Sequence, residues 1–285
     1  RAALKAQRNK TDKTDARGLA QIVRTGWYRE AHTKSPAHYR LRLLLANRRN
    51  LKRKCLDLEN AIRHSLKAFG IKLEVRGRAD FENKVRDAVR PDPVLSGLCE
   101  AMLRARAALW TEFTRLHQLL VQVTLKDEVC ARFMEIPGVG PVTALSVKTA
   151  IDDPHRFGRS RNVGAHFGLT SRRWQSGTAV DTQLGISKQG DTDVRTALYE
   201  AASALLTRSK VACDLKTWGR KLAARIGHKK AVTAVARRLA VTMHAMWRDG
   251  THFDFGKPEP AGKAEVTRGR HRKVKRARLA AAGAA

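Results

Sequence analysis

The stretch IPGVGPVTA, residues 136–144, lies between two segments of helical periodicity. Gly138 and Gly140 permit a tight turn with exposed backbone N–H groups, and Pro141 favours the first turn of a following helix. The positive end of that helix dipole faces the same way, which favours a bound anion. The stretch is therefore typical of a helix-hairpin-helix that holds a nucleic-acid phosphate. A plain turn between two packed helices would use the same residues, so this second interpretation stays open.

Shorter helical patterns continue on both sides of this turn. Between His166 and Ser187 the residues instead alternate in character, with Gly177 and Gly185 as breaks, which predicts a β-hairpin. Helices are expected at 127–135, 141–149, 160–167, 191–208, 213–226 and 229–248. Residues 127–250 are therefore predicted to form one helical domain with a small β-hairpin.

Two longer helical patterns precede this domain. Apolar residues recur at alternating spacings of four and three from Leu44 to Phe69 and again from Leu98 to Val123. An irregular connector with Pro91 separates the two patterns. They predict an antiparallel helical hairpin of the coiled-coil type over residues 36–126. Such a hairpin packs either within its own chain or against a second protomer, and its polar breaks leave both possibilities open.

The two ends of the chain differ from this helical middle. A helix is expected from Asp12 to Thr25, followed by a short strand over residues 27–32. Residues 257–278 contain nine Lys or Arg against two Glu, and a low-complexity AAAGAA end follows. Residues 251–285 are therefore predicted to form a basic disordered tail. The chain as a whole is predicted to be mainly α.

The charge balance points to a polyanionic partner. The sequence has 57 Lys and Arg against 26 Asp and Glu, a formal net charge of +31, and self-repulsion of that size does not help folding. A hydrophobic content of 42% excludes wholesale disorder. No apolar run is long enough to span a membrane, and the amino end has no signal-peptide core, which leaves the cytoplasm or the nucleoid. The four widely spaced cysteines indicate reduced thiols rather than a zinc or disulfide framework.

The segment GISKQGD, residues 185–191, is a candidate for catalysis. Ser187 lies between two glycines at the start of an expected helix, and Lys188 and Arg195 favour a phosphate near its hydroxyl. Serine before a helix is more commonly a cap or a loop residue. A nucleophilic serine also needs a proton acceptor, and the sequence assigns none. Arg172 and Arg173 on the expected β-hairpin are further candidates for nucleic-acid binding.

Asp12 and Asp15 are the candidate metal ligands. They are three residues apart, so on a helix they share a face and can reach one divalent ion. Capping of the helix start is the simpler alternative, since Thr and Asp are favoured there. The ten histidines show no H-x-x-x-H or H-E-x-x-H spacing, which argues against a histidine metal site.

Several motifs together resemble one family of proteins. They are NKTDKTDARG near the amino end, the long helical connector, IPGVGPVTA, and the downstream run from RFGRSRNVGAHFGLT to GISKQGDTDVRTALYEAA. In this order and spacing they resemble the insertion-sequence transposases of the "one-ten" family over residues 9–250. These DNA recombinases have an amino-terminal RuvC-like DEDD domain, a coiled-coil linker and a carboxy-terminal transposase domain.

The resemblance implies roles for particular residues. Asp12 and Asp15 match the last two carboxylates of the DEDD quartet, which holds magnesium in that family. Ser187 matches the serine implicated as the nucleophile that joins to DNA. The resemblance also implies DNA and an element-encoded guide RNA as partners, and a homo-oligomer that brings the metal site and the serine together between protomers.

One departure from the family pattern concerns the amino end. A RuvC-like domain has an earlier Asp and Glu on strands, but nothing acidic precedes Asp12 here. We therefore expect the chain to be a fragment, a reading frame with a wrongly assigned start, or a decayed copy. Residues 1–35 would then be the carboxy-terminal remnant of a RuvC-like α/β domain, with half of the quartet missing.

The leading hypothesis from the sequence is a DNA transposase or site-specific recombinase that uses a serine nucleophile and a magnesium-dependent DEDD site, guided by RNA. This chain alone is expected to be inactive, because half of the quartet is absent. One alternative is a protein that binds nucleic acid without cutting it. Another is a truncated regulator that assembles with intact transposase. The gene sequence upstream of Arg1 would separate these hypotheses.

Overall fold

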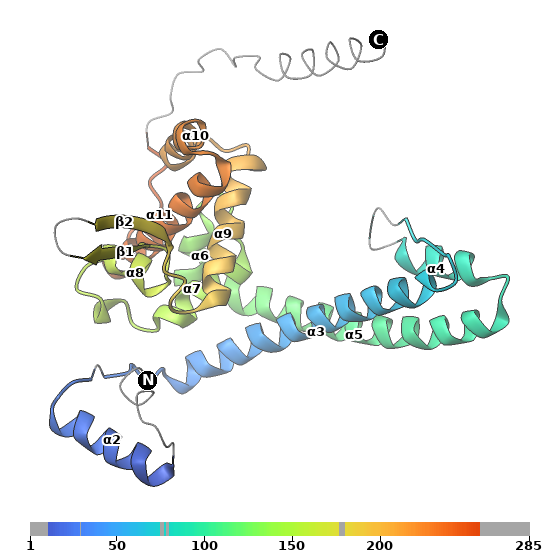
Figure 1. Cartoon of the computed structure of the whole chain (residues 1–285). Helices are drawn as coiled ribbons and strands as arrows, with labels where there is room; N and C mark the ends of the chain where they lie inside the picture. Colours follow the sequence, from blue (N-terminus) through green and yellow to red (C-terminus); the bar gives the residue numbers. More distant parts are fainter. Residues whose placement is uncertain (1–10, 29, 75–76, 78–79, 177–179, 257–285) are drawn as a thin grey trace, which may run out of the picture.

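The computed structural model describes residues 11–28, 30–74, 77, 80–176 and 180–256, and this part of the chain is mainly helical, as predicted (Figure 1). A long two-helix arm projects from a helical body that carries one β-hairpin. The elements in chain order are α2 Asp12–Arg24, α3 Pro36–Lys67, α4 Phe81–Val89, α5 Pro93–Leu125, α6 Glu128–Met134, α7 Pro141–Ile151, the 3₁₀ turn η1 Pro154–Arg156, α8 Arg161–His166, β1 Ser171–Ser176, β2 Val180–Ile186, α9 Thr192–Thr207, α10 Asp214–Ile226 and α11 His228–Asp249.

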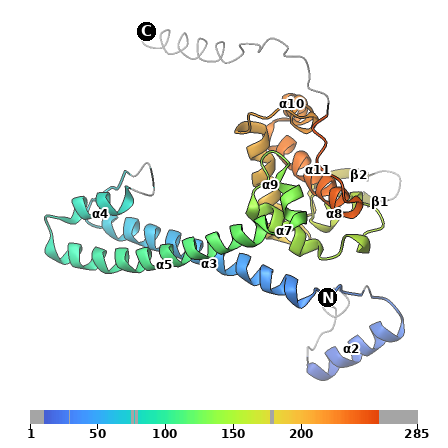
Figure 2. The ribbon, with the colours of Figure 1, turned by 180° about the vertical axis from the view of Figure 1, so that it is seen from behind.

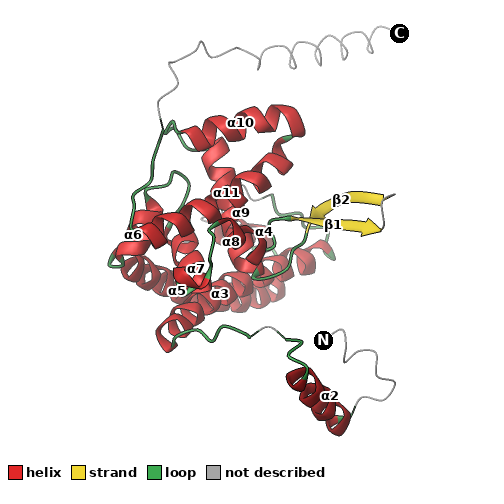
Figure 3. Ribbon diagram, turned by 90° about the vertical axis from the view of Figure 1, so that its left-hand side faces the viewer, coloured by secondary structure: helices red, strands yellow, loops and turns green. Residues whose placement is uncertain are grey.

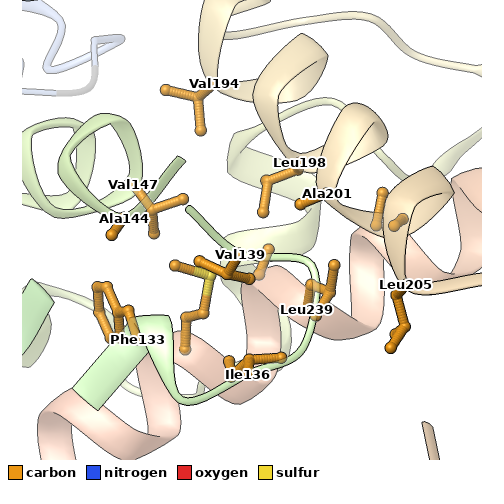
Figure 4. Packing of buried hydrophobic residues seen from close by; sticks show 14 of the residues in the cluster. Phe133, Ile136, Val139, Ala144, Val147, Val194, Leu198, Ala201, Leu205 and Leu239 are labelled. Carbon is orange, nitrogen blue, oxygen red and sulfur yellow. The ribbon is translucent and has the colours of Figure 1, made fainter. Parts of the chain in front are cut away.

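The core of the body is built around α7. Nearly every residue of α7 from Thr143 to Ile151 is buried, including the small polar residues Thr143, Ser146 and Thr149. Figure 4 shows Ala144 and Val147 of α7 facing Val194 and Leu198 of α9. The one charged residue of α7, Lys148, is half-buried and forms an ion pair with Asp127 at the start of α6.

Helices α3 and α5 run antiparallel and pack along each other to form the arm (Figures 1 and 2). The predicted antiparallel hairpin forms, and the pairing of its arms with a second protomer stays a prediction. At the base of the arm, Leu41, Leu44 and Leu45 of α3 pack against the core of the body, and Leu120 of α5 is part of it. The arm and the body thus share one hydrophobic core at their junction.

The connector between the two long helices is not wholly irregular, which corrects the sequence expectation. It contains α4, whose Phe81, Val85 and Val89 are completely buried at helical spacing against α3 and α5. Because α4 covers one side of α5, the buried residues there are Leu95, Cys99 and Leu103. Leu98, which begins the predicted seam, is 63% exposed.

A buried ion cluster joins the three helices of the arm. The guanidinium of Arg106 on α5 donates to Glu59 of α3 at 2.8 and 2.9 Å and to Glu82 of α4 at 2.7 Å. Arg106 and Glu59 are both buried. Removing one partner would leave a buried charge unpaired, so the cluster fixes how α4 is placed on the arm.

Strands β1 and β2 form the predicted antiparallel hairpin, which projects from the helical body (Figure 3). Ser171 pairs with Ile186 and Arg173 with Gln183, so two residues of β2 oppose one of β1. This is a β-bulge that contains Gly185, a residue type favoured at such positions. The bulge lies at the base of the hairpin, directly before Ser187.

The amino-terminal segment differs from expectation at one point. Helix α2 forms as predicted, but the described residues of 27–32 are not a strand, because no neighbouring strand is present for them to pair with in the described part of the chain. Leu19 and Val23 on the apolar side of α2 are 54% and 65% exposed. Figures 1 and 3 show α2 standing apart from the body.

Two further sequence expectations concern the cysteines and the tail. All four cysteines are buried and none forms a disulfide in the described chain, in agreement with reduced structural thiols. The predicted basic tail lies outside the described residues from residue 257 onward. Among the described helices, none combines the length and the apolar character that crossing a membrane requires.

Candidate functional site

Ser187 lies directly after β2, in a short loop of residues 187–190 that leads to α9. The Ser187 backbone N–H donates to the carbonyl of Thr170 at 2.8 Å, and the Lys188 N–H donates to that of Gly168 at 3.1 Å. The loop is thus hydrogen-bonded to the segment between α8 and β1. We call residues 187–190 the Ser187 loop.

Two glycines allow the Ser187 loop and the end of α8 to approach backbone to backbone. A Cβ on Gly168 would lie 2.1 Å from the carbonyl oxygen of Gln189, and a Cβ on Gly190 would lie 2.0 Å from that of His166. Both glycines also have positive φ values, +66° and +83°, which side chains disfavour. No other residue type fits at either position without moving the loop.

The Ser187 hydroxyl is half-buried and has no role in capping α9. That role belongs to Asp191, whose carboxylate accepts from the backbone N–H groups of Asp193 at 3.0 Å and Val194 at 3.2 Å. The Ser187 oxygen accepts one long bond, from the Gln189 N–H at 3.5 Å. Ser187 is therefore not a helix cap but a loop residue, which is the other half of that alternative, and its hydroxyl is left for other contacts.

The two cations predicted beside Ser187 have different surroundings. Lys188 is exposed, and its backbone is in the left-handed region with φ of +56°. Arg195 instead reaches back from α9 and donates to the carbonyls of Phe167 at 3.0 Å and Gln189 at 3.2 Å. Its guanidinium therefore fastens the Ser187 loop to the end of α8. Nucleic-acid binding by Lys188 and Arg195 stays a prediction.

The histidine at the end of α8, His166, contacts the Ser187 loop through its backbone. Its partial burial, and then the charges of Arg156 and Lys34, lower the pKa of His166 to about 4. The ring is therefore neutral at pH 7, and its Nε2 lies 3.2 Å from the Arg156 guanidinium. In the described structure no imidazole or carboxylate hydrogen-bonds to the Ser187 hydroxyl.

Arg172 and Arg173 are exposed on β1, at the base of the projecting hairpin. Both lie on β1, whose first residue pairs with Ile186, the residue directly before Ser187. The structure thus places them near the Ser187 loop, and their contact with nucleic acid stays a prediction.

The two glycines of the 136–144 turn have separate roles. Gly138 has φ of +93°, and a Cβ there would lie 2.6 Å from the Ala201 carbonyl oxygen on α9. It is needed for close packing of the turn on α9, beside buried Ile136 and Val139 (Figure 4). Gly140 is the N-cap of α7, with extended backbone and open space around its Cβ position. Of these two glycines, only Gly140 is therefore free of tertiary packing demands.

Asp12 and Asp15 lie in the first turn of α2, where Thr11 and Thr14 form a reciprocal capping box. The capping role thus belongs to the threonines. Asp12 is exposed and Asp15 half-buried, and no group of three His, Cys, Asp or Glu able to hold a metal occurs among the described residues. α2 stands apart from the body, so the structure does not bring these aspartates to Ser187 (Figure 3).

A cluster around Asp152 was not foreseen from the sequence. Its carboxylate accepts from His32 Nε2 at 2.6 Å and from the Ser35 hydroxyl at 3.2 Å, while His38 Nδ1 lies 2.5 Å away. Burial acts to raise the pKa of Asp152, but the hydrogen bonds of His32 and Ser35 and the charge on His38 lower it overall. The cluster anchors the chain before α3 to the end of α7. His32 and Ser35 lie 120 and 117 positions from Asp152, so no local pattern indicates the cluster.

The comparisons with known proteins agree on one family. Residues 130–216 match the model of the "Transposase IS116/IS110/IS902 family". This span begins within α6 and includes the 136–144 turn, the β-hairpin and the Ser187 loop, and it ends within α10. The structural elements that hold Ser187 therefore all lie inside the matched domain.

Individual relatives point the same way. The chain is 33% identical over 246 residues to the transposase for insertion sequence element IS1111A of Coxiella burnetii, an alignment that covers 84% of this chain and 66% of the relative. It is 31% identical over 128 residues to the transposase for insertion sequence element IS1328 of Yersinia enterocolitica, covering 45% of this chain and 38% of the relative. A pilin gene-inverting protein of Moraxella bovis is 27% identical over 119 residues, covering 42% and 37%.

The chain thus spans just under two thirds of the length of the Coxiella relative. The family match, the relatives and the fold of the matched span are consistent with one another. The chain therefore belongs to the IS116/IS110/IS902 family of insertion-sequence transposases.

Proposed function

We propose that this chain carries the strand-exchange domain of a DNA transposase or site-specific recombinase, with Ser187 as the nucleophile. The serine oxygen attacks the phosphorus of a DNA phosphodiester and forms an Oγ–phosphorus bond. The bond from that phosphorus to one sugar oxygen breaks, and the released sugar oxygen takes up the serine proton. One phosphate ester bond forms and one breaks. The step therefore needs no external energy source and is reversible.

The observation that carries this proposal is the construction of the Ser187 loop. The loop is held by backbone hydrogen bonds, by the close approach at Gly168 and Gly190, and by the Arg195 guanidinium. The serine hydroxyl has no capping role in this frame. A small polar side chain that is held rigidly but used little for stability is typical of a reactive position.

The basic character of the chain supports nucleic-acid partners. We propose DNA as the substrate and an element-encoded guide RNA as a second partner, which together suit a net charge of +31. Phosphate contacts from Gly140 at the start of α7, and from Lys188, Arg172 and Arg173, would position the backbone without reading its sequence.

Magnesium is the proposed cofactor, with Asp12 and Asp15 as two of its ligands. Two carboxylates from one helical turn do not supply the near-octahedral set that this ion demands, so the described residues alone do not fit a magnesium site. We therefore expect negligible magnesium-dependent recombination by this chain on its own. We also propose a homo-oligomer, in which α2 of one protomer approaches the Ser187 loop of another.

The proposal is tested with the protein expressed from its whole reading frame, labelled DNA, magnesium and any required guide RNA. A denaturing gel detects a covalent protein–DNA adduct. Ser187→Ala should abolish the adduct while DNA binding stays close to wild type, since one hydroxyl contributes little to a contact with many phosphates. Ser65→Ala, the same change at an exposed serine on α3 in the arm, is the control and should keep the adduct. An adduct that persists in Ser187→Ala would exclude Ser187 as the nucleophile.

A second candidate function is a regulator that binds nucleic acid or intact transposase without cutting DNA. The separation of Asp12 and Asp15 from Ser187 within this chain favours it. Such a regulator would lower the activity of an intact relative in a mixture, and the Ser187→Ala variant would lower it equally.

A further inference from the structure

A cavity of about 960 Å³ lies between α8, the base of the β-hairpin, α10 and α11. Its cationic lining consists of Arg161, Lys229, Lys230, Arg237 and Arg238, and its described lining contains no Asp or Glu. None of these five side chains forms an ion pair with a carboxylate in the described structure. We call this cavity the basic groove. Five unneutralised cations around one hollow repel one another, which a bound polyanion would relieve.

Two of the arginines are held in place by neighbouring residues. The Arg238 guanidinium stacks over the Trp218 ring at 4.9 Å from its centroid. The Arg237 side chain lies across α8 at Gly164, where an added Cβ would come within 2.9 Å of the Arg237 Cγ. Each of these side chains thus has a neighbour that restricts its rotamers, which lowers the entropy cost of binding.

The start of α11 gives a second, independent indication of an anion. Its N-cap is Gly227, with no side-chain cap hydrogen bond, and its first turn has no acidic residue. Lys229 and Lys230 instead add positive charge to the positive end of a 22-residue helix dipole. This arrangement costs stability in the free protein, and a phosphate group beside Lys229 and Lys230 would reverse that cost.

The basic groove also reaches the proposed reaction centre. Ser171, Gly185 and Ile186 are part of its lining, and Ile186 is the residue directly before Ser187. The groove therefore begins next to the position that a phosphate attacked by Ser187 would occupy. We infer that the basic groove binds the phosphate backbone of the DNA strand that Ser187 attacks. This inference rests on the proposed function and adds the path of the strand to it.

The test measures binding of the full chain to a fluorescein-labelled DNA duplex by anisotropy over a range of salt concentrations. The groove variant is Lys229→Glu with Lys230→Glu. The control is Lys54→Glu with Lys84→Glu, which changes the charge equally at two exposed positions on the arm. The groove variant should bind DNA about tenfold more weakly at low salt, and the slope of log affinity against log salt should become about two units less steep. The control should stay near wild type.

Thermal unfolding separates a binding role from a structural one. Glutamates in the first turn complement the helix dipole, so the groove variant should melt at or above the wild-type temperature although it binds less tightly. Lys229→Gln with Lys230→Gln serves as a second variant without charge reversal and should show a smaller loss of affinity at a melting temperature at or above that of the wild type.

Each other outcome overturns a defined statement. Wild-type protein that fails to bind DNA would contradict the proposed function as well as the inference. Wild-type binding with equal affinities for the groove and control variants would leave the proposed function standing and exclude the groove as the DNA path. A loss confined to a labelled structured RNA, with DNA affinity unchanged, would also overturn the inference and assign the groove to RNA.

Discussion

Single glycines determine where the Ser187 hydroxyl sits. Gly168 and Gly190 flank the segment that contains the β-hairpin, and each leaves out a Cβ at a point of contact between two backbones. The serine itself makes few stabilising contacts, so its position depends on these neighbours. At the scale of the residue, the position of the Ser187 hydroxyl is therefore sensitive to substitutions of neighbouring residues that leave the serine itself unchanged.

We expect Gly168→Ala to destabilise the body by at least about 2 kcal/mol, because the left-handed backbone alone costs roughly 1–2 kcal/mol and the clash with Gln189 adds to it. Gly185→Ala is the control, since Gly185 has open space around its Cβ position. Urea unfolding followed by circular dichroism measures both variants. Wild-type stability in Gly168→Ala would show that the two backbones are not in close contact.

At the scale of the element, the turn between α6 and α7 combines two roles that its sequence does not separate. Gly138 packs on α9, whereas Gly140 caps α7 and faces open space. A variant that replaces both glycines by valine would therefore confuse loss of packing with loss of phosphate contact. The two positions need to be changed one at a time.

We expect Gly138→Ala to lower the free energy of unfolding by about 2 kcal/mol or more, because its φ of +93° and the contact with Ala201 both exclude a Cβ. Gly140→Ser should leave stability unchanged or slightly higher, since serine is a better N-cap than glycine. Chemical unfolding gives the stability, and anisotropy with DNA gives the affinity.

The affinity of Gly140→Ser then decides between the two interpretations of the turn. The serine side chain competes for the free N–H groups of the first turn of α7, so DNA affinity should fall if those groups hold a phosphate. Unchanged affinity in this folded variant would assign the turn to structure alone.

At the scale of the whole molecule, the excess of positive charge is not spread evenly. Several carboxylates in the arm and at its base pair with arginines, as Glu59 and Glu82 do with Arg106 and Asp191 does with Arg42. The basic groove has no such pairs among its described lining residues. The groove therefore concentrates positive charge that no described carboxylate of its lining offsets.

We expect DNA binding by the full chain to fall steeply as salt rises, because neutralising Z phosphates releases counterions with a slope of about −0.9Z. Removing residues 257–285, which carry nine Lys or Arg between 257 and 278, should make the slope less steep without abolishing binding. Anisotropy titrations at several salt concentrations measure both proteins. An affinity that does not change with salt would contradict a role for the basic surface.

Much of the fold follows from local sequence. The spacing of apolar residues predicts the helices of the body, the antiparallel arm and the β-hairpin, because helix and strand periodicities are set by short-range geometry. The motifs from NKTDKTDARG to GISKQGD also indicate the transposase family through their order and spacing alone. Asp12, Asp15 and Ser187 follow from the same motifs, and their chemistry stays a prediction.

Which residues meet depends on the tertiary structure. The face of α5 that is buried depends on α4, a short helix that no long apolar pattern predicts. The Asp152 cluster joins His32 and Ser35 to the far end of α7. Gly138 and Gly140 look equivalent in the sequence, but α9 lies against only one of them. Arg237, Arg238, Lys229 and Lys230 have the pattern of a solvated helix face, yet α8, α10 and the hairpin enclose them in one groove. The physical reason is that periodicity reports which side of an element is apolar, whereas charge neutralisation and backbone contact depend on neighbours that are distant in the chain.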